Sequence, residues 1–351
     1  MKKIVCSIII GLLSPFASAA PTSVSDFVIF SGGTLIIDGG FETAIGGHTV
    51  INGDIGSNQD LFLQGNPILP DYPAQLNGSA YAGRNLTFGQ DLTVGNSLEL
   101  REVIANGDAV IGGDTTIWGT LDAFDYTLGT GASVSGGATA PSSNTFTLIS
   151  MPVGTTFTAG GANQTVDSGL DQLTLAPSTY GTLATSQQNQ TINLSSGDYY
   201  IDEFTVQGSF TLEIDLTSGD PINLYSVGDL DFTAQGLQLK VKGTGTGGAF
   251  VPISDAPDLA SLIYQETYGD FNMGGENAWG GTVYASLDPL ALEDPKSDVN
   301  IGQYINWTGA VYAYDTVDVA DHGTWNYVAV IPEPATLCLL GLGALLLRKR
   351  T

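Results

Sequence analysis

Acidic side chains are the most numerous groups in this sequence that could do chemistry. Asp54, Asp108 and Asp114 recur at expected turns, and Asp229 and Asp231 flank an expected strand. Glycosidases need two carboxyl groups about 5–10 Å apart, and strands stacked about 4.8 Å apart could supply that spacing. However, each of these aspartates has a turn-like sequence context, where the side chain bonds to its own backbone. The sequence therefore predicts a protein that is not an enzyme. A carbohydrate-active β-helix enzyme, either a polysaccharide lyase or a hydrolase, is the alternative.

Two dense acidic stretches near the C-terminal end are candidate calcium sites. The candidate ligands are Asp294, Asp298, Asp315 and Asp318. Neither stretch follows the EF-hand loop or the Gly-rich calcium-binding nonapeptide, so a solvated acidic surface is the alternative. Calcium is the one cofactor considered, and otherwise none is predicted.

The charge balance bears on the partners of the protein. The chain has 36 Asp and Glu residues against 10 Lys and Arg residues, which gives a formal net charge of −26. Nucleic acid is therefore excluded as a partner, because its binding depends on basic side chains that neutralise phosphates.

Aromatic side chains suggest adhesion as a non-enzymatic role. Stacked on one face, they would form a strip that binds sugar rings, and the alternative is that they fill the corners of the fold. The residues concerned are Trp118, Trp279, Trp307, Trp325, Tyr284 and Tyr312.

A short phrase recurs three times in the first half of the chain. It begins with Asn-Gly at Asn52, Asn77 and Asn106, and a triplet with alternating side chains starts nine residues after each Asn. An Asn-Gly pair suits a turn with positive φ, and the triplet predicts a strand with one buried face. Each unit is too small to bury its apolar face alone, so it must stack on the next unit.

A second repeat joins the two halves of the chain. Gly-Thr-Val-Tyr-Ala at 281–285 returns as Gly-Ala-Val-Tyr-Ala at 309–313, and a similar Gly-Ser-Ala-Tyr-Ala stands at 78–82. The sequence thus predicts an all-β protein, a parallel β-helix or β-solenoid that consists of one body or of two related halves. The two predicted halves span 26–140 and 171–328, joined by a Ser/Thr-rich connector at 141–170 in which 146–149 could form one more strand. Separate β-sandwich domains are the alternative.

The N-terminal residues 1–19 have the features of a secretory signal peptide. Two lysines precede an apolar run, and Ala17 and Ala19 form an A-x-A cleavage site.

The C-terminal residues 332–351 form a tripartite tail. Pro332, Glu333 and Pro334 precede an apolar run, and the basic residues Arg348, Lys349 and Arg350 follow it. The run is short for a permanent anchor, since a helix of its length spans about 20 Å of a hydrocarbon core about 30 Å thick. It predicts a short transmembrane segment that is inserted transiently.

This tail resembles the PEP-CTERM sorting signals of Gram-negative bacteria, a tail also catalogued as an ice-binding protein C-terminal domain. The resemblance implies export, processing by an exosortase-type protease of the inner membrane, and a place at the cell surface or in the extracellular matrix. Such proteins accompany exopolysaccharide production and biofilm formation, so an extracellular polysaccharide is a candidate partner.

The body of the chain also resembles secreted proteins of the choice-of-anchor type. The resemblance rests on the run 159–165, the segment 196–201 and the repeats that end in Tyr-Ala. It implies a β-rich secreted body and assigns no chemistry. The sequence as a whole predicts an exported structural or adhesive β-solenoid.

Overall fold

A computed structural model of the protein describes residues 21–37, 49–64, 74–152, 154–166, 172–233, 236–288, 297–320 and 322–328. The predicted signal peptide, with Ala17 and Ala19, lies outside these residues, and so does the predicted sorting tail. In the part of the chain that is described, no helix has the length and apolar character needed to cross a membrane.

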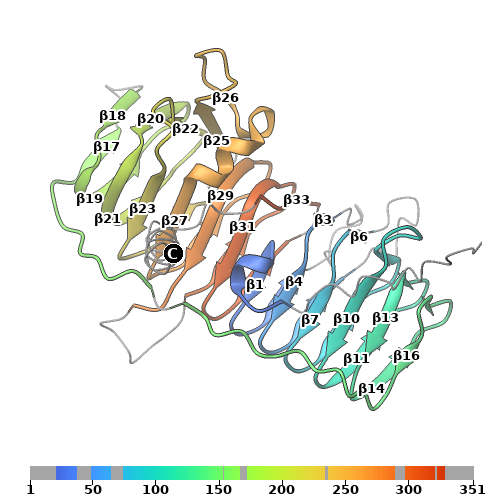
Figure 1. Ribbon diagram of the computed structural model, residues 1–351. Helices are drawn as coiled ribbons and strands as arrows, with labels where there is room; N and C mark the ends of the chain where they lie inside the picture. Colours follow the sequence, from blue (N-terminus) through green and yellow to red (C-terminus); the bar gives the residue numbers. More distant parts are fainter. Residues whose placement is uncertain are drawn as a thin grey trace, which may run out of the picture.

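Short parallel strands stack into a solenoid with three faces, which we call A, B and C (Figure 1). Alternate side chains of each strand point into the core: in β5 (Leu61–Leu63), Leu61 and Leu63 are buried while Phe62 is partly exposed. The predicted β-solenoid is confirmed, and the β-sandwich alternative is wrong.

Face A consists of strands from both halves of the chain. They are β1 (Ile29–Ser31), β4 (Ile55–Ser57), β7 (Ala80–Ala82), β10 (Arg101–Ala105), β13 (Gly119–Asp122), β16 (Ala138–Thr139), β23 (Ile222–Ser226) and β27 (Ile263–Thr267), with the first parts of β19 (Ser178–Thr185) and β21 (Gly197–Thr205) and the last parts of β29 (Ala278–Ala285) and β31 (Asn306–Ala313).

Face B follows face A along each coil. Besides β5 and the last parts of β19 and β21, it contains β2 (Leu35–Ile37), β8 (Leu86–Phe88), β11 (Asp108–Ile111), β14 (Asp125–Leu128), β17 (Gln164–Val166), β24 (Leu230–Phe232), β28 (Phe271–Met273), β30 (Val299–Ile301) and β32 (Val317–Val319).

Face C completes the coil. Besides the first parts of β29 and β31, it contains β3 (Val50–Asn52), β6 (Ala74–Leu76), β9 (Leu92–Val94), β12 (Thr116–Ile117), β15 (Ser133–Val134), β18 (Gln172–Leu175), β20 (Gln190–Ser195), β22 (Phe210–Asp215), β25 (Gln238–Lys242) and β33 (Thr324–Asn326).

Four short elements lie outside the three faces. They are the 3-10 helices η1 (Val24–Asp26), η2 (Ile253–Asp255) and η3 (Pro257–Leu262), and β26 (Val251–Pro252), which pairs antiparallel with β25.

The two halves form one continuous solenoid, although the order of the coils in space differs from their order in the chain. The last coil stacks on the first: Val311 pairs with Ile29, Val317 with Leu35, and Trp325 with Ile51. Figure 1 shows this junction where β31 and β33 lie next to β1 and β3. The first described strand, β1, therefore lies in the middle of the solenoid. The chain builds from there toward one end and then restarts at the opposite end.

The Tyr-Ala repeats mark the same position in different coils. Tyr284 pairs with Tyr312, Tyr312 with Phe30, and Tyr81 lies two coils further along the same column. One coil pattern therefore spans both halves, as the sequence indicated.

The Asn-Gly phrase marks equivalent positions only in its first two copies. Asn77 donates a side-chain hydrogen bond to Asn52 (2.8 Å), because both lie at the corner between faces C and A. Asn106 follows β10 and lies at the next corner, between faces A and B, one residue past the paired Ala105 and Ala82. The prediction of three equivalent copies is wrong for the third, because Asn-Gly suits a tight turn at any corner.

Residues 141–163 form an extended segment, here called the strap, which runs along the solenoid from β16 to β17 (Figure 1). Its described residues contain no strand, so the alternative that 146–149 form one is wrong. The strap lies on face A, where it covers the outward side chains of that face.

Candidate functional site

The predicted site residues fall into two groups in the structure. Asp294 and the residues of the sorting motif lie outside the described part of the chain. Asp298 and Asp315 lie at the corner between faces A and B, and Asp318 lies on the outer side of face B. In the described residues, no group of three or more His, Cys, Asp or Glu side chains is arranged to hold a metal ion.

Asp298 belongs to a column of acidic residues at the corner between faces A and B. The Oδ1 atom of Asp229 accepts the N–H of Asp270 (2.8 Å), Oδ1 of Asp270 accepts the N–H of Asp298 (3.0 Å), and Oδ1 of Asp298 accepts the N–H of Thr316 (3.0 Å). Burial, and then the two flanking carboxylates, raise the pKa of Asp270. Each of these carboxylates therefore bonds to the backbone of the next coil.

The same column continues in the first half of the chain. Oδ1 of Asp60 accepts the N–H of Asn85 (3.1 Å), and Oδ1 of Asn85 accepts the N–H of Asp108 (3.1 Å). The sequence signal that we missed is an Asp or Asn directly before most of the alternating triplets of face B, whereas Thr34 and Thr316 occupy this position before β2 and β32.

Most of the aromatic residues considered for a sugar-binding strip are buried. Trp279, Trp307 and Trp325 have no exposed surface, and Tyr284 and Tyr312 are at most 5 % exposed. The tryptophans point into the core from face C, where the rings of Trp307 and Trp325 stack with centroids 5.4 Å apart. These five residues therefore form no sugar-binding strip, and the alternative that they fill the fold is correct for them.

Side-chain hydrogen bonds hold the strap against face A. Asn106 donates to the carbonyl of Phe146 and accepts its N–H (both 2.8 Å), and Asn58 does the same for Ile149 (2.7 and 2.8 Å). A side-chain amide that bonds to both backbone groups of one residue replaces the pairing that a neighbouring strand would give. Asp122 adds bonds from Ser142 (2.9 Å) and from the side chain of Asn144 (3.1 Å).

The carboxyl group of Glu266 is buried beneath the strap. Oε1 accepts the N–H of Thr155 (2.7 Å) and the hydroxyl of Ser286 (2.9 Å), and Oε2 accepts the hydroxyl of Tyr264 (3.0 Å). Burial raises the pKa of Glu266, and the hydrogen bonds oppose this effect. The hydroxyl of Tyr284 donates to the strap at the carbonyl of Pro152. With three donors on one buried carboxyl group, the arrangement holds the strap.

A second group of acids lies on face A in the first half of the chain. Burial raises the pKa of Asp54 and of Glu102, and the neighbouring Asp122 adds to the shift of Glu102. The carboxylate of Asp54 accepts the N–H of Ser79 (2.8 Å). Carboxyl groups with raised pKa values often occur at active sites, so this group is the observation that favours the glycosidase alternative.

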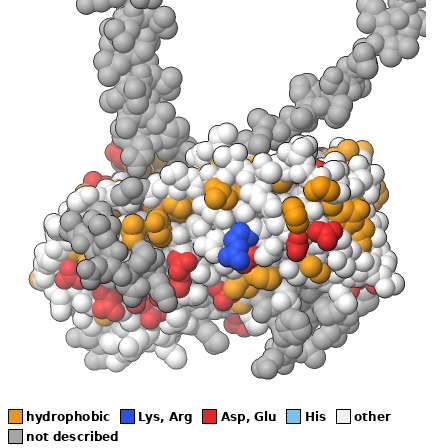
Figure 2. Space-filling model, turned by 90° about the horizontal axis from the view of Figure 1, so that it is seen from below, with side chains coloured by type: hydrophobic (Ala, Val, Ile, Leu, Met, Phe, Trp, Pro, Cys, Tyr) orange, Lys and Arg blue, Asp and Glu red, His pale blue; other side chains and the backbone are white. Residues whose placement is uncertain are grey.

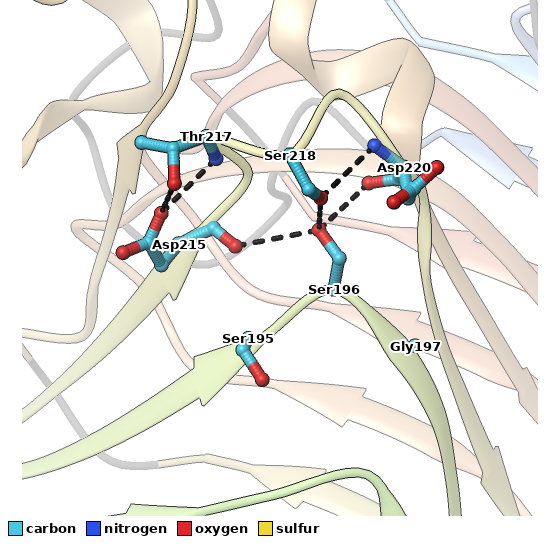
Figure 3. A pocket seen from close by; sticks show the side chains of 7 residues that line it. All are labelled: Ser195, Ser196, Gly197, Asp215, Thr217, Ser218 and Asp220. Carbon is cyan, nitrogen blue, oxygen red and sulfur yellow. Dashed lines mark hydrogen bonds between the residues drawn. The ribbon is translucent and has the colours of Figure 1, made fainter.

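An open polar pocket of about 550 Å³ lies between β20, β21 and β22 (Figure 3). Ser196 Oγ donates to the carbonyl of Asp220 (2.8 Å) and accepts from Ser218 Oγ (3.0 Å). Asp215 accepts the hydroxyl of Thr217 (2.6 Å) and the ammonium of Lys242 (2.9 Å), and these two bonds lower its pKa. Because its pKa is lowered, Asp215 is ionised and cannot act as a general acid. The residues that line the pocket include no histidine that could activate a serine as a nucleophile. The pocket suits water or a small polar group.

Face B has a long column of outward side chains that the strap does not cover. In the second half of the chain the column is polar, and Asn300 donates to the side-chain oxygen of Asn272 (2.9 Å). A shallow hollow of about 240 Å³ adjoins these two residues and Asp318. In the first half the column becomes apolar and Thr-rich. In spatial order it reads Thr205, Asp231, Asn272, Asn300, Asp318, Ile36, Phe62, Thr87, Val110 and Thr127.

Basic side chains are scarce over the described surface. Arg84 lies 3.8 Å from Asp60, Arg101 is 2.7 Å from Glu99, and Lys242 contacts Asp215. Figure 2 shows one side of the molecule, on which acidic and apolar groups are spread widely and basic groups are few. The surface therefore suits uncharged or cationic partners rather than polyanions.

A comparison with solved structures gives a distant similarity. An ice-binding protein from an Antarctic bacterium of the Flavobacteriaceae is 12 % identical, with 90 % of this chain and 100 % of that chain covered and a TM-score of 0.25. A TM-score this low supports no argument, so the fold rests on the strand pairings above. No curated protein matches the chain.

A family comparison identifies the end of the chain. Residues 330–350 match the PEP-CTERM protein-sorting motif, which agrees with the resemblance noted in the sequence and implies export with processing by an exosortase. The protein is thus a β-solenoid that carries a PEP-CTERM sorting motif at its C-terminal end.

Proposed function

We propose that this protein is a non-catalytic structural or adhesive component of the outer surface or extracellular matrix of a Gram-negative bacterium. The observation that carries the proposal is the combination of the sorting motif with a continuous solenoid whose face B is not covered by the strap. In this proposal the tail is inserted transiently into the inner membrane, and an exosortase-type protease then removes it.

Face B is the proposed adhesive surface, and an extracellular polysaccharide is its proposed partner. Amide and carboxylate groups repeat there once per coil, about 4.8 Å apart, next to the apolar side chains of Ile36 and Phe62. Sugars present hydroxyl groups beside apolar ring faces, so a column whose polar part continues into an apolar part suits a long carbohydrate chain.

Retention on the polysaccharide of the producing organism tests this proposal. The variant Asn272→Ala/Asn300→Ala removes two side-chain amides from face B, and Thr93→Ala/Thr116→Ala is the matched control on the outer side of face C. Each lost hydrogen bond costs about 1 kcal/mol, so we expect the double variant to bind about tenfold more weakly or worse. The control should bind like the unmodified protein, and equal binding by all three proteins would contradict the assignment to face B.

A carbohydrate-active enzyme is the second candidate, favoured by the raised pKa values of Asp54 and Glu102. The same experiment separates the two candidates. Soluble sugar products that disappear in Glu102→Gln would indicate an enzyme, whereas retention without products supports a binding protein.

The proposed role requires no cofactor, and calcium is the one ion to test. The thermal unfolding midpoint with calcium should be compared with the midpoint in a chelator. Equal midpoints would remove calcium from the account, and a higher midpoint with calcium would add it.

A further inference from the structure

Both ends of the solenoid expose unpaired strand edges. In the described residues, β14, β15 and β16 pair only inward, with β11, β12 and β13. At the opposite end, β17 and β18 likewise pair only with β19 and β20. Open edges of this kind are templates for pairing with another chain.

Few charged residues occur at either edge. Among β14, β15, β16, β17 and β18, the one charged residue is Asp125, the first residue of β14. Proteins commonly protect edge strands with Lys side chains or with a covering segment. Here apolar side chains of the end coils, including Val134 and Leu173, are only partly buried against the core.

The two ends also have complementary shapes. At one end β16 begins a coil on face A, and the chain leaves for the strap before faces B and C are formed. At the other end the first coil has β17 on face B and β18 on face C, while its face A contains only 160–163 beside Tyr180. One end therefore supplies the strand that the other end lacks.

The coils at the two ends are similar in size. Thr116 and its partner Ser133 are 17 residues apart, and Val166 and its partner Thr185 are 19 apart. In the middle of the molecule, Asn272 and its partner Asn300 are 28 residues apart. The solenoid therefore narrows toward both ends to a similar length of chain per coil.

The molecule already contains a junction of this kind. Strands β1, β2 and β3 pair in parallel with β31, β32 and β33, although the two coils are not consecutive in the chain. Pairing between coils without direct chain connection is therefore sufficient to join two pieces of this solenoid.

We propose that the exported protein assembles head to tail into filaments, in which the β14–β16 end of one copy pairs with the β17–β19 end of the next. The strands of both ends run in the same direction around the axis, so the joint continues the parallel sheet. A head-to-tail contact that does not close into a ring gives an open filament. The inference does not depend on the proposed adhesive role of face B.

The register of the joint follows from the columns of face B. The pairings between neighbouring strands link one column of outward residues along face B. Thr127 lies at one end of this column and Thr165 at the other. The proposal therefore places Thr127 of one copy opposite Thr165 of the next. Both side chains are exposed in the single copy.

Mixed disulfide formation tests the joint directly. Thr127→Cys and Thr165→Cys are made as separate full-length proteins, with Cys6 and Cys338 replaced by serine, and are then mixed under mild oxidation. Adjacent strands hold paired Cα atoms within the range of 4.4–6.8 Å that a disulfide spans. We expect the mixed dimer to exceed, at least tenfold, the mixed dimer from Thr87→Cys and Thr205→Cys, which lie in the same column away from the ends.

Sedimentation of the unmodified protein gives a second, independent readout. Its average mass should rise with concentration, because each filament grows by the addition of single copies. A monomeric mass at every concentration, with no mixed dimer above the Thr87/Thr205 control, would overturn the proposal. Dimers that form within the Thr127→Cys sample alone would also overturn it, because they indicate head-to-head contact.

Discussion

Faces A and B belong to the same sheet and differ in what covers them. On face A the outward column contains Tyr225, Tyr284, Tyr312, Phe30 and Tyr81, and all five are at most 9 % exposed. On face B the side chains of the corresponding outward column are not buried: Phe62 is partly exposed and Val110 is exposed. The difference arises from the strap.

The strap converts the outer side of face A into a second core. Phe146 packs against Phe27 and Tyr81, with ring centroids 6.4 and 5.5 Å apart, and Phe157 stacks on Tyr268 at 4.3 Å. An outward aromatic side chain therefore contributes to stability on face A, whereas on face B it is available for contact with a partner. Matched substitutions on face A and elsewhere on the surface therefore measure what the strap contributes.

The largest expected difference is between two phenylalanines. Phe146→Ala removes a side chain that is 3 % exposed, and we expect it to destabilise the protein by about 3–4 kcal/mol. Phe62→Ala, on face B, should cost less than about 1 kcal/mol, because its ring is partly in water already. Urea unfolding measures both values, and similar costs for the two variants would show that the strap does not form a core.

A smaller difference is expected between two asparagines. Asn106→Ala removes both hydrogen bonds to Phe146 and leaves backbone groups without partners, which should cost about 1–3 kcal/mol. Asn272→Ala, on face B, should change stability by no more than about 0.5 kcal/mol. Faster proteolysis within 141–163 in Asn106→Ala, but not in Asn272→Ala, would locate the effect in the strap.

The smallest effect concerns pH. Burial raises the pKa of Glu266 above its ordinary value of 4.5. The folded state therefore binds more protons than the unfolded state between pH 4.5 and the raised pKa, and this group makes stability fall as pH rises through that interval. One proton limits the slope to about 1.4 kcal/mol per pH unit.

Glu266→Gln should remove this contribution, whereas Glu203→Gln, at an exposed position, should retain it. Other acids with raised pKa values, such as Asp54 and Glu102, titrate in all three proteins, so the difference between unfolding curves isolates Glu266. An identical pH dependence in Glu266→Gln and the unmodified protein would refute the role of this carboxyl group.

The strands and the coil pattern could be predicted from the sequence because their signals are local. The alternating triplets at 61–63 and 86–88 form β5 and β8, and the Tyr-Ala repeats occupy one column. Which corner a turn occupies was not predictable, as Asn106 shows, because the number of residues per coil falls from 25 between Asn52 and Asn77 to 17 between Thr116 and Ser133.

The path of the strap and the burial of the tryptophans depend on contacts far apart in the chain. Phe146 is 40 residues from Asn106, and Thr155 is 111 residues from Glu266. Whether Trp307 points inward depends on the register of β31 against β29 and β33, and a shift of one residue would reverse it. Of the candidate calcium ligands, Asp298 bonds to Asp270 and Thr316, which come from the neighbouring coils, so the sequence around Asp298 does not reveal these contacts.

The central claim is that the last coil of the chain stacks directly on the first, and one cross-link tests it. Ile36 and Asp318 are paired neighbours on the outer side of face B and are 282 positions apart in the chain. In a background with Cys6 and Cys338 replaced by serine, Ile36→Cys/Asp318→Cys should form an intrachain disulfide as readily as the control Asn272→Cys/Asn300→Cys. A control that links while residues 36 and 318 do not would contradict the continuous solenoid.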